Sequence, residues 1–367
     1  MRIVSGLLLI TGVIVAGDVD RTPVNEIVFP QNMAIGAYHS IGFSNMVHFQ
    51  PAEIGSANPA SMSSFSAAAM GINFEYATKL DYLLDMTLDR QYQYLPTDAG
   101  FVYPLGRLSM GLGYQQKYNH LLDAGEIPLT TNEDPFGSSD STFHPILKTV
   151  VRTVSGLISY SFPNLFSPEG TLSFGLQAGL DIVSISEDFP GGQVNADGNG
   201  MSWKIGVLYE KKDIYGIGLF FEKSVDIEIT KSYGDSIGSF ESLLILPDVI
   251  SAGFWLSAAE DISLNLTAAY VLWKDLNDQF KNNLDISANI IYDYSESYAF
   301  SLGLFNTDRG SEENYFNIDN SATFLSLAAR AKFSSFALRL EVADSHLGAE
   351  ENRQQTQIKL GLDYSFK

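Results

Sequence analysis

The sequence predicts an all-β fold, a transmembrane β-barrel of about 14 antiparallel strands whose lumen holds an N-terminal hatch. Three observations predict it. Apolar residues alternate with small or polar ones from residue 70 onward, and the connections between alternating stretches are short and long in turn. The chain also starts with an apolar run that is shorter than a membrane-spanning helix.

Alternation with a period of two residues is the recurring pattern of the chain. It is clear in residues 172–182, 262–272 and 358–366, where apolar positions are separated by residues such as Ser263 and Asn265. A soluble β-sandwich would bury the apolar face in a core. A membrane barrel turns that face toward lipid and lines its lumen with the small and polar residues.

About 14 segments follow this pattern, and an even number places both ends of the barrel on the periplasmic side. We expect strands over residues 70–76, 81–94, 104–118, 151–163, 170–186, 200–212, 214–231, 248–258, 260–274, 283–293, 297–306, 322–333, 335–344 and 356–367.

The connections distinguish a membrane barrel from a sandwich, because barrels make short periplasmic turns and long external loops. Short connections are expected at Lys211-Lys212-Asp213, near Ala259, from Tyr294 to Glu296 and at Ser334. Long ones are expected at 119–150, 187–199, 232–247, 275–282, 307–321 and 345–355. This order favours the barrel and places Phe366, near the C-terminus, at the periplasmic end.

The N-terminus indicates export. Arg2 precedes the apolar run from Ile3 to Ala16, and small residues lead to Gly17, so we expect residues 1–17 to be a signal peptide. Residues 18–69 lack alternation, yet they are too apolar for a disordered tail. We therefore expect them to form the hatch, and residues 70–367 to form the barrel, because the lumen of about 14 strands is too wide for its own side chains to fill.

Composition excludes several classes of function. The formal net charge is −21, with 22 basic and 43 acidic residues, which argues against a nucleic-acid partner. The chain has no cysteine, and it contains no HExxH or phosphate-binding loop pattern. We expect no enzyme activity, no catalytic residue, no metal site and no cofactor.

Three stretches resemble a known family. They are Gly55-Ser56-Ala57-Asn58-Pro59-Ala60-Ser61-Met62, Leu246-Pro247-Asp248-Val249-Ile250-Ser251-Ala252-Gly253 and Tyr270-Val271-Leu272-Trp273-Lys274-Asp275-Leu276. The first is similar to the Asn-Pro-Ala element of the hatch of the FadL/TodX-type transporters of long-chain fatty acids and hydrophobic compounds. The other two resemble a pair of strands in that family, with a Pro before the first and a Trp closing the second.

The resemblance implies passive transport of hydrophobic small molecules, either long-chain fatty acids or hydrocarbons, across the outer membrane of a Gram-negative bacterium. It makes Asn58, Pro59 and Ala60 the hatch motif. Cargo would leave sideways toward membrane lipid at a kink in the third strand, for which Pro104, Gly106, Gly111 and Gly113 are the candidates. The hatch shows no basic pair to hold a carboxylate, which leaves neutral hydrocarbons open. The alternative is a barrel subunit that binds a protein partner in a secretion or assembly system.

Candidate ligand contacts are apolar residues of the hatch and apolar residues on the otherwise polar face of the strands. They are Met33, Phe43, Met46, Phe49, Leu157, Phe220, Phe254, Ile291 and Phe305. Packing against the hatch would explain the same residues without a ligand.

Overall fold

The computed structural model describes residues 21–23, 42–81, 87–89, 96–129, 141–189, 192–224, 226–233, 238–275, 282–307, 322–348 and 354–366. The expected signal peptide and Met33 lie outside these residues. In the described part of the chain, no helix is long and apolar enough to cross a membrane.

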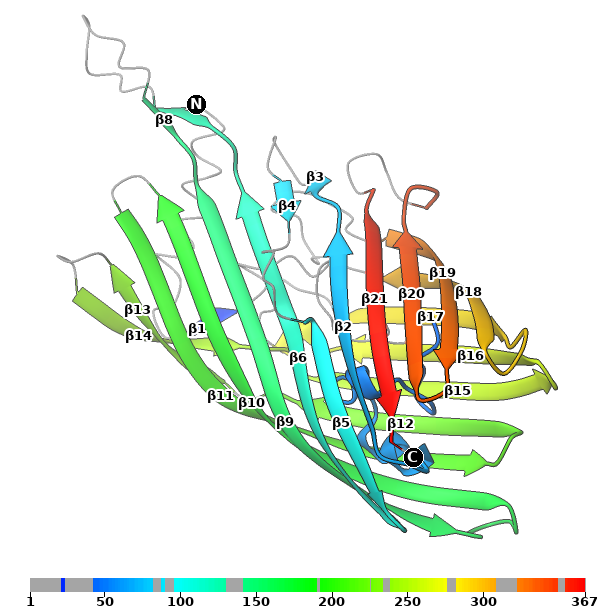
Figure 1. Cartoon of the computed structure of the whole chain (residues 1–367). Coiled ribbons are helices and arrows are strands. Elements are labelled where there is room, and N and C mark those ends of the chain that lie inside the picture. The colour runs from blue at the N-terminus through cyan, green and yellow to red at the C-terminus, as the bar shows by residue number, and fades with distance from the viewer. Residues whose placement is uncertain are drawn as a thin grey trace, which may run out of the picture.

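Fourteen antiparallel strands close into a barrel, as the alternation predicts (Figure 1). Each strand pairs with the next, and the first, β2, also pairs with the last, β21, so that the ring has no free edge. The strands are β2 (Ala69–Ala77), β5 (Asp98–Leu105), β6 (Leu108–Asp123), β9 (Ile146–Pro163), β10 (Gly170–Phe189), β11 (Gly192–Lys211), β12 (Tyr215–Lys223), β15 (Val249–Ala259), β16 (Ile262–Val271), β17 (Asn283–Tyr292), β18 (Tyr298–Thr307), β19 (Ala322–Phe333), β20 (Phe336–Asp344) and β21 (Thr356–Ser365).

Short strands extend this wall. They are β1 (Arg21–Pro23), β3 (Leu80–Asp81), β4 (Thr87–Asp89), β13 (Ile227–Tyr233) and β14 (Gly238–Ile245), while β7 (Ile127–Leu129) and β8 (Ser141–Phe143) form a separate hairpin. β13 continues the course of β12, and β14 leads into β15. Asp248 braces the break between these paired strands, because its carboxylate accepts the backbone N–H of Ser224 at 3.0 Å.

The second and third strands differ from the sequence prediction. Segments 81–94 and 104–118 are expected there, but the structure has β5 and β6 instead. The reason is Gly106, which adopts a φ of 69° in a tight turn, so that Leu105 pairs with Leu108 and the chain reverses inside the predicted third segment.

Several expected loops are continuations of strands. β10 and β11 pair as far as Phe189 and Gly192, so most of 187–199 is hairpin, and part of 232–247 belongs to β13 and β14. Residues 119–123 and 146–150 likewise extend β6 and β9. A strand beyond the bilayer needs no apolar outer face, so these extensions lack the alternation that marks the rest.

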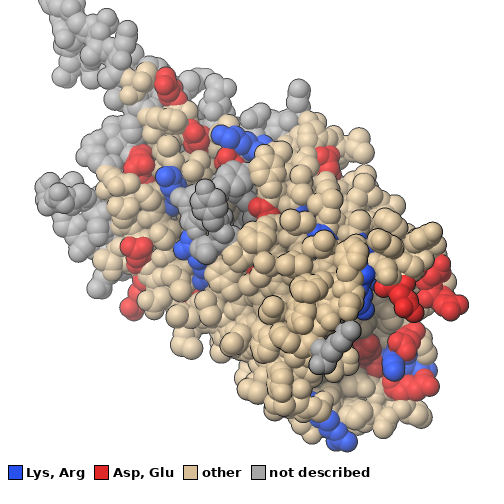
Figure 2. All heavy atoms as spheres, viewed as in Figure 1, with Lys and Arg blue, Asp and Glu red and all other residues tan. Residues whose placement is uncertain are grey.

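The outer face of the barrel carries the apolar side chains. Leu302 and Leu304 on β18 are 49% and 53% exposed, whereas Ser301 and Phe305, on either side of them in the same strand, point inward and are buried. Figure 2 shows charged residues mainly toward the two ends of the molecule, with a mostly uncharged band between them. An uncharged, apolar band around a closed barrel is the surface that faces membrane lipid.

Candidate functional site

A segment of the chain lies inside the ring of strands (Figure 1). We call residues 42–68 the inner segment. It contains two 3-10 helices, η3 (Pro51–Glu53) and η4 (Pro59–Ser64), each with Pro in its first turn. Proline suits this position because its missing N–H would have no partner there. Asn58 begins η4, and its side chain accepts the Ala60 N–H at 3.0 Å.

The inner segment touches the backbone of the wall directly at a row of glycines. Gly71 on β2 pairs with Gly100 on β5, which pairs with Gly113 on β6. A Cβ added at any of the three would collide with the inner segment, at Ala52, Pro51 or Gly55 respectively. The wall and the inner segment are therefore in van der Waals contact through positions that only glycine can occupy.

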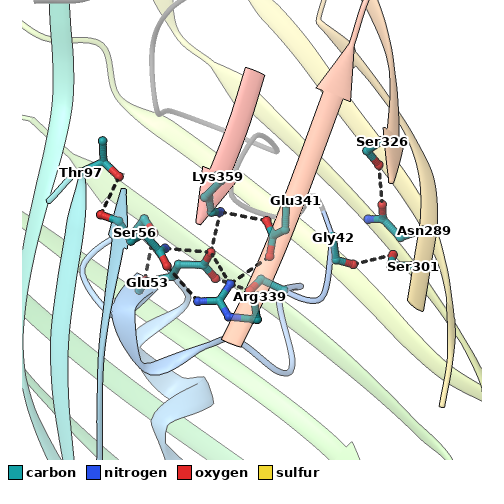
Figure 3. A network of polar contacts seen from close by, with 12 residues as sticks. Gly42, Glu53, Ser56, Thr97, Asn289, Ser301, Ser326, Arg339, Glu341 and Lys359 are labelled. Atoms are coloured by element: carbon teal, nitrogen blue, oxygen red, sulfur yellow. Dashed lines mark hydrogen bonds and ion pairs between the residues drawn. The ribbon is translucent and has the colours of Figure 1, made fainter. Parts of the chain in front are cut away.

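Buried charges attach the inner segment to the last two strands (Figure 3). Glu53 accepts a hydrogen bond from Lys359 of β21 at 2.6 Å and lies 3.8 Å from Arg339 of β20. Arg339 also donates to Asp363 at 2.8 Å and to Glu341 at 2.9 Å. We call these five residues the charge clamp.

The charge clamp is buried, so its ionic groups depend on one another rather than on water. Glu53 is 1% exposed. Burial raises the pKa of its carboxyl, but Lys359 and Arg339 outweigh that effect and hold the pKa at about 2. Its contribution to docking is therefore complete above the ordinary carboxyl range and is lost as pH falls toward about 2.

A second set of contacts holds the next part of the inner segment against β10, β11 and β12. Lys204 of β11 donates to the carbonyl of Ser56 at 3.1 Å, and Gln177 of β10 donates to the carbonyl of Gly55 at 2.8 Å. Asn58 donates to the backbone carbonyl of Val207 at 3.1 Å. Lys204 also pairs with Glu222 at 3.1 Å, and Lys117 of β6 lies 2.8 Å from the same carboxylate. Both of these wall cations therefore have a carboxylate partner.

Toward the loop ends of the strands, buried apolar residues pack together inside the ring, and we call this group of side chains the outer chamber. For example, Val271 is the last residue of β16 and Ala343 the last but one of β20, so both lie at the loop ends of their strands. Members from around the ring include Met46, Tyr118, Val151, Val183, Ile185, Ile227, Ile229, Leu244, Leu246, Val249, Val271, Trp273, Phe305, Phe324 and Ala343. Leu246 and Trp273 come from two of the three stretches that carry the family resemblance.

The candidate ligand contacts fall into three separate clusters. Met46, Phe220 and Phe305 lie in the outer chamber. Phe49 packs with Leu157, and Phe43 packs with Ile291.

Phe254 is expected on the lumen face of its strand, and this expectation is wrong. It points outward from β15 and is 37% exposed, because it pairs with Leu266, which lies on the lipid-facing side of β16. Both faces of β15 carry apolar residues, so alternation within this strand leaves its orientation undecided. The register with β16 determines it.

The four residues expected to kink the third strand are divided between two strands and a turn. Pro104 belongs to β5 and Gly106 to the turn after it. Gly111 and Gly113 lie on β6 and face the inner segment. The irregularity in β6 lies further along, at Lys117, where the register with β9 shifts by one residue.

Sequence reasoning did not single out the charge clamp. A signal for it exists, because Arg339 and Glu341 on one strand and Lys359 and Asp363 on another occupy positions of the lumen face. Charged residues on a lumen face are ordinary in barrels. Only their meeting with Glu53, which lies 306 positions before Lys359 in the chain, gives them a role.

These features define a transmembrane β-barrel of the outer-membrane type, with a segment of its own chain docked inside and a group of buried apolar side chains beside that segment. Among the described residues, no group of His, Cys, Asp and Glu is arranged to hold a metal ion.

Solved structures with this fold include the Ralstonia pickettii toluene transporter TbuX. It matches with a TM-score of 0.65 and 11% identity over 93% of this chain and 100% of that chain. A Pseudomonas aeruginosa FadL homologue matches with a TM-score of 0.60 and 12% identity, over 93% and 99% of the two chains. The monoaromatic hydrocarbon channel CymD matches with a TM-score of 0.58 and 13% identity, over 92% and 98%. The sequence matches no protein-family model and no curated protein. At these identities the likeness is one of fold.

Proposed function

We propose that this protein carries neutral hydrophobic small molecules passively across the outer membrane of a Gram-negative bacterium. The outer chamber is the observation that carries the proposal. Buried apolar side chains from strands all around the ring line the loop-side half of the lumen. A water-filled pore has a polar lumen, whereas a site for a hydrophobic molecule is lined mainly by apolar and aromatic side chains.

The cations of the lumen support a neutral cargo. Arg339, Lys359, Lys117 and Lys204 are each within 3.3 Å of at least one wall carboxylate. A fatty-acid carboxylate would have to displace one of these partners, at the cost of leaving a buried charge without its pair. A hydrocarbon carries no charge, so it would displace none of these partners.

In this proposal, residues 18–69 form the hatch and block a straight path through the barrel. Support comes from the described part of that range, where the inner segment meets the wall at glycines and at the charge clamp. Cargo leaves sideways toward lipid. An apolar groove of about 450 Å³ on the outer face is lined by Gly71, Gly100 and Gly113, whose inner sides touch the inner segment.

The test is uptake of radiolabelled toluene and radiolabelled oleate by cells that express the protein. Phe305 lies in the outer chamber at 2% exposure. We expect Phe305→Asn to lower toluene uptake by roughly tenfold or more, because a buried Phe contact is worth about 1.5–3 kcal/mol. The matched control is Phe166→Asn, since Phe166 is 82% exposed in a turn between β9 and β10.

Two results would contradict the proposal. If Phe305→Asn folds and takes up toluene like the unaltered protein, the outer chamber is not on the path. If oleate enters as fast as toluene and competes with it, the cargo is not restricted to neutral molecules.

A further inference from the structure

The charge clamp contains one more carboxylate than it has cations. Glu53, Glu341 and Asp363 share Arg339 and Lys359. Without Glu53, Arg339 and Lys359 keep Glu341 and Asp363 as partners, and buried Asp98 of β5 interacts electrostatically with Lys359 as well. The inner segment therefore docks by adding an anion to cations that already have wall carboxylates.

The distances show that the wall pairs do not depend on Glu53. Arg339 has its close contacts with Asp363, Glu341 and Asn73, at 2.8–2.9 Å, and Glu53 is its most distant partner at 3.8 Å. Lys359 keeps Glu341 at 3.3 Å. Removing one member of a buried ion pair is costly mainly when the other is left alone, and here neither cation would be.

Two members of the second set have the same property, whereas Gln177 would lose the Gly55 carbonyl. Lys204 keeps Glu222 when the carbonyl of Ser56 moves away. The carbonyls that Asn58 contacts, on Val207 and Leu219, belong to paired strands. Undocking the inner segment thus leaves these wall groups with partners, while Glu53 would regain the solvation that burial removed.

We propose that Glu53 is a releasable latch, the residue whose ion pairs keep the inner segment docked and whose departure opens the barrel. The proposal rests on the proposed function only in taking the inner segment to be an obstacle in the lumen. Glu53 is a positioning residue in this scheme and touches no cargo.

The first test measures ionic conductance of the purified protein in planar bilayers, in KCl without any cargo. Glu53→Gln removes the charge but keeps the side-chain shape. A hydrogen bond between charged groups is worth enough to change the ratio of docked to undocked protein by roughly 10- to 100-fold, and we expect open events to increase to that extent. Glu53→Asp, which keeps the charge at shorter reach, should lie between the two.

The matched control is Asp344→Asn. Asp344 lies at the loop end of the strand that carries Arg339, and its carboxylate contacts His346 and Thr356 rather than the inner segment. This variant should conduct like the unaltered protein.

The second test locks the inner segment in place. The hydroxyl oxygens of Ser63 in η4 and Ser173 on β10 are 2.7 Å apart, and the chain has no cysteine of its own. Ser63→Cys with Ser173→Cys should form a single disulfide. Added to Glu53→Gln, the oxidised bridge should return conductance to the unaltered level, and a reductant should restore the open events.

The latch is overturned if folded Glu53→Gln conducts like the unaltered protein, or if the oxidised bridge leaves its high conductance unchanged. Folding is checked by the shift in gel mobility on heating. A Glu53→Gln that does not fold also counts against the latch, because the wall should be self-sufficient without Glu53. None of these outcomes depends on toluene uptake, so a failed transport assay and a failed latch are separate results.

Discussion

Residues without side chains make the closest contacts between the wall and the inner segment. Gly175 of β10 faces the start of η4, and a Cβ built there would clash with the backbone of Pro59 and Ala60. Gly156, on neighbouring β9, has open space where its Cβ would be. The two glycines therefore provide a direct comparison between close packing and free space.

We predict that Gly175→Ala lowers the free energy of unfolding by about 1–3 kcal/mol, the usual cost of forcing extra volume into a packed interior. Gly156→Ala should change it by less than about 0.5 kcal/mol, as surface substitutions do. Urea denaturation in detergent micelles measures both. Equal effects would mean that the inner segment is free to shift away from β10.

At the scale of elements, η4 is held at its N-cap residue, Asn58, which directly precedes the helix. The Asn58 side chain caps the helix through Ala60 and also donates to Val207 on β11 and Leu219 on β12. One amide thereby fixes both the shape of the helix and its seat on two strands. Ser61 adds a bond from its hydroxyl to the carbonyl of Met46 at 2.6 Å.

We predict that Asn58→Ala makes the inner segment accessible to protease while the barrel stays intact. The loss of a cap and of wall contacts should cost about 1–3 kcal/mol, enough to raise the undocked fraction several-fold or more. Limited proteolysis with mass spectrometry locates the cuts. Ser64→Ala, which removes only a bond to the Ser61 carbonyl within the same helix, is the control. Protection of both variants would contradict the anchoring role of Asn58.

The elements that sequence reasoning predicts best are those whose two faces meet different surroundings. The strands from 262 to 344 are close to their expected bounds, because one face meets lipid and the other the lumen. The predicted third strand, 104–118, is wrong because it runs across the turn at Gly106, where the outward apolar positions shift from Tyr103 and Leu105 to Leu108 and Met110. Of the candidate ligand contacts, Met46, Phe220 and Phe305 lie in one buried cluster, and their contact with a ligand stays a prediction. The partners of Glu53 depend on contacts that no local pattern records.

At the scale of the whole molecule, the free-energy cost of placing a charge on the outer face should depend on its depth in the membrane. Leu302 lies at the middle of β18 and points outward, while Phe333 points outward at the end of β19, next to a periplasmic turn. We predict that Leu302→Lys costs about 2–4 kcal/mol of unfolding free energy in lipid vesicles, against about 0–1 for Phe333→Lys. Reversible urea unfolding in vesicles measures both. A similar cost at the two positions would contradict this placement of the membrane.

The strands differ in length around the ring. β10 and β11 have 20 residues each, whereas β17 and β18 have 10, which is about what a tilted strand needs to cross a bilayer. The rim of the barrel is therefore sloped. On a living cell, an antibody or a bacteriophage would meet the tall β10–β11 side first. Under the proposed function, a hydrophobic molecule already dissolved in the outer leaflet meets the shortest strands of the wall at β17 and β18.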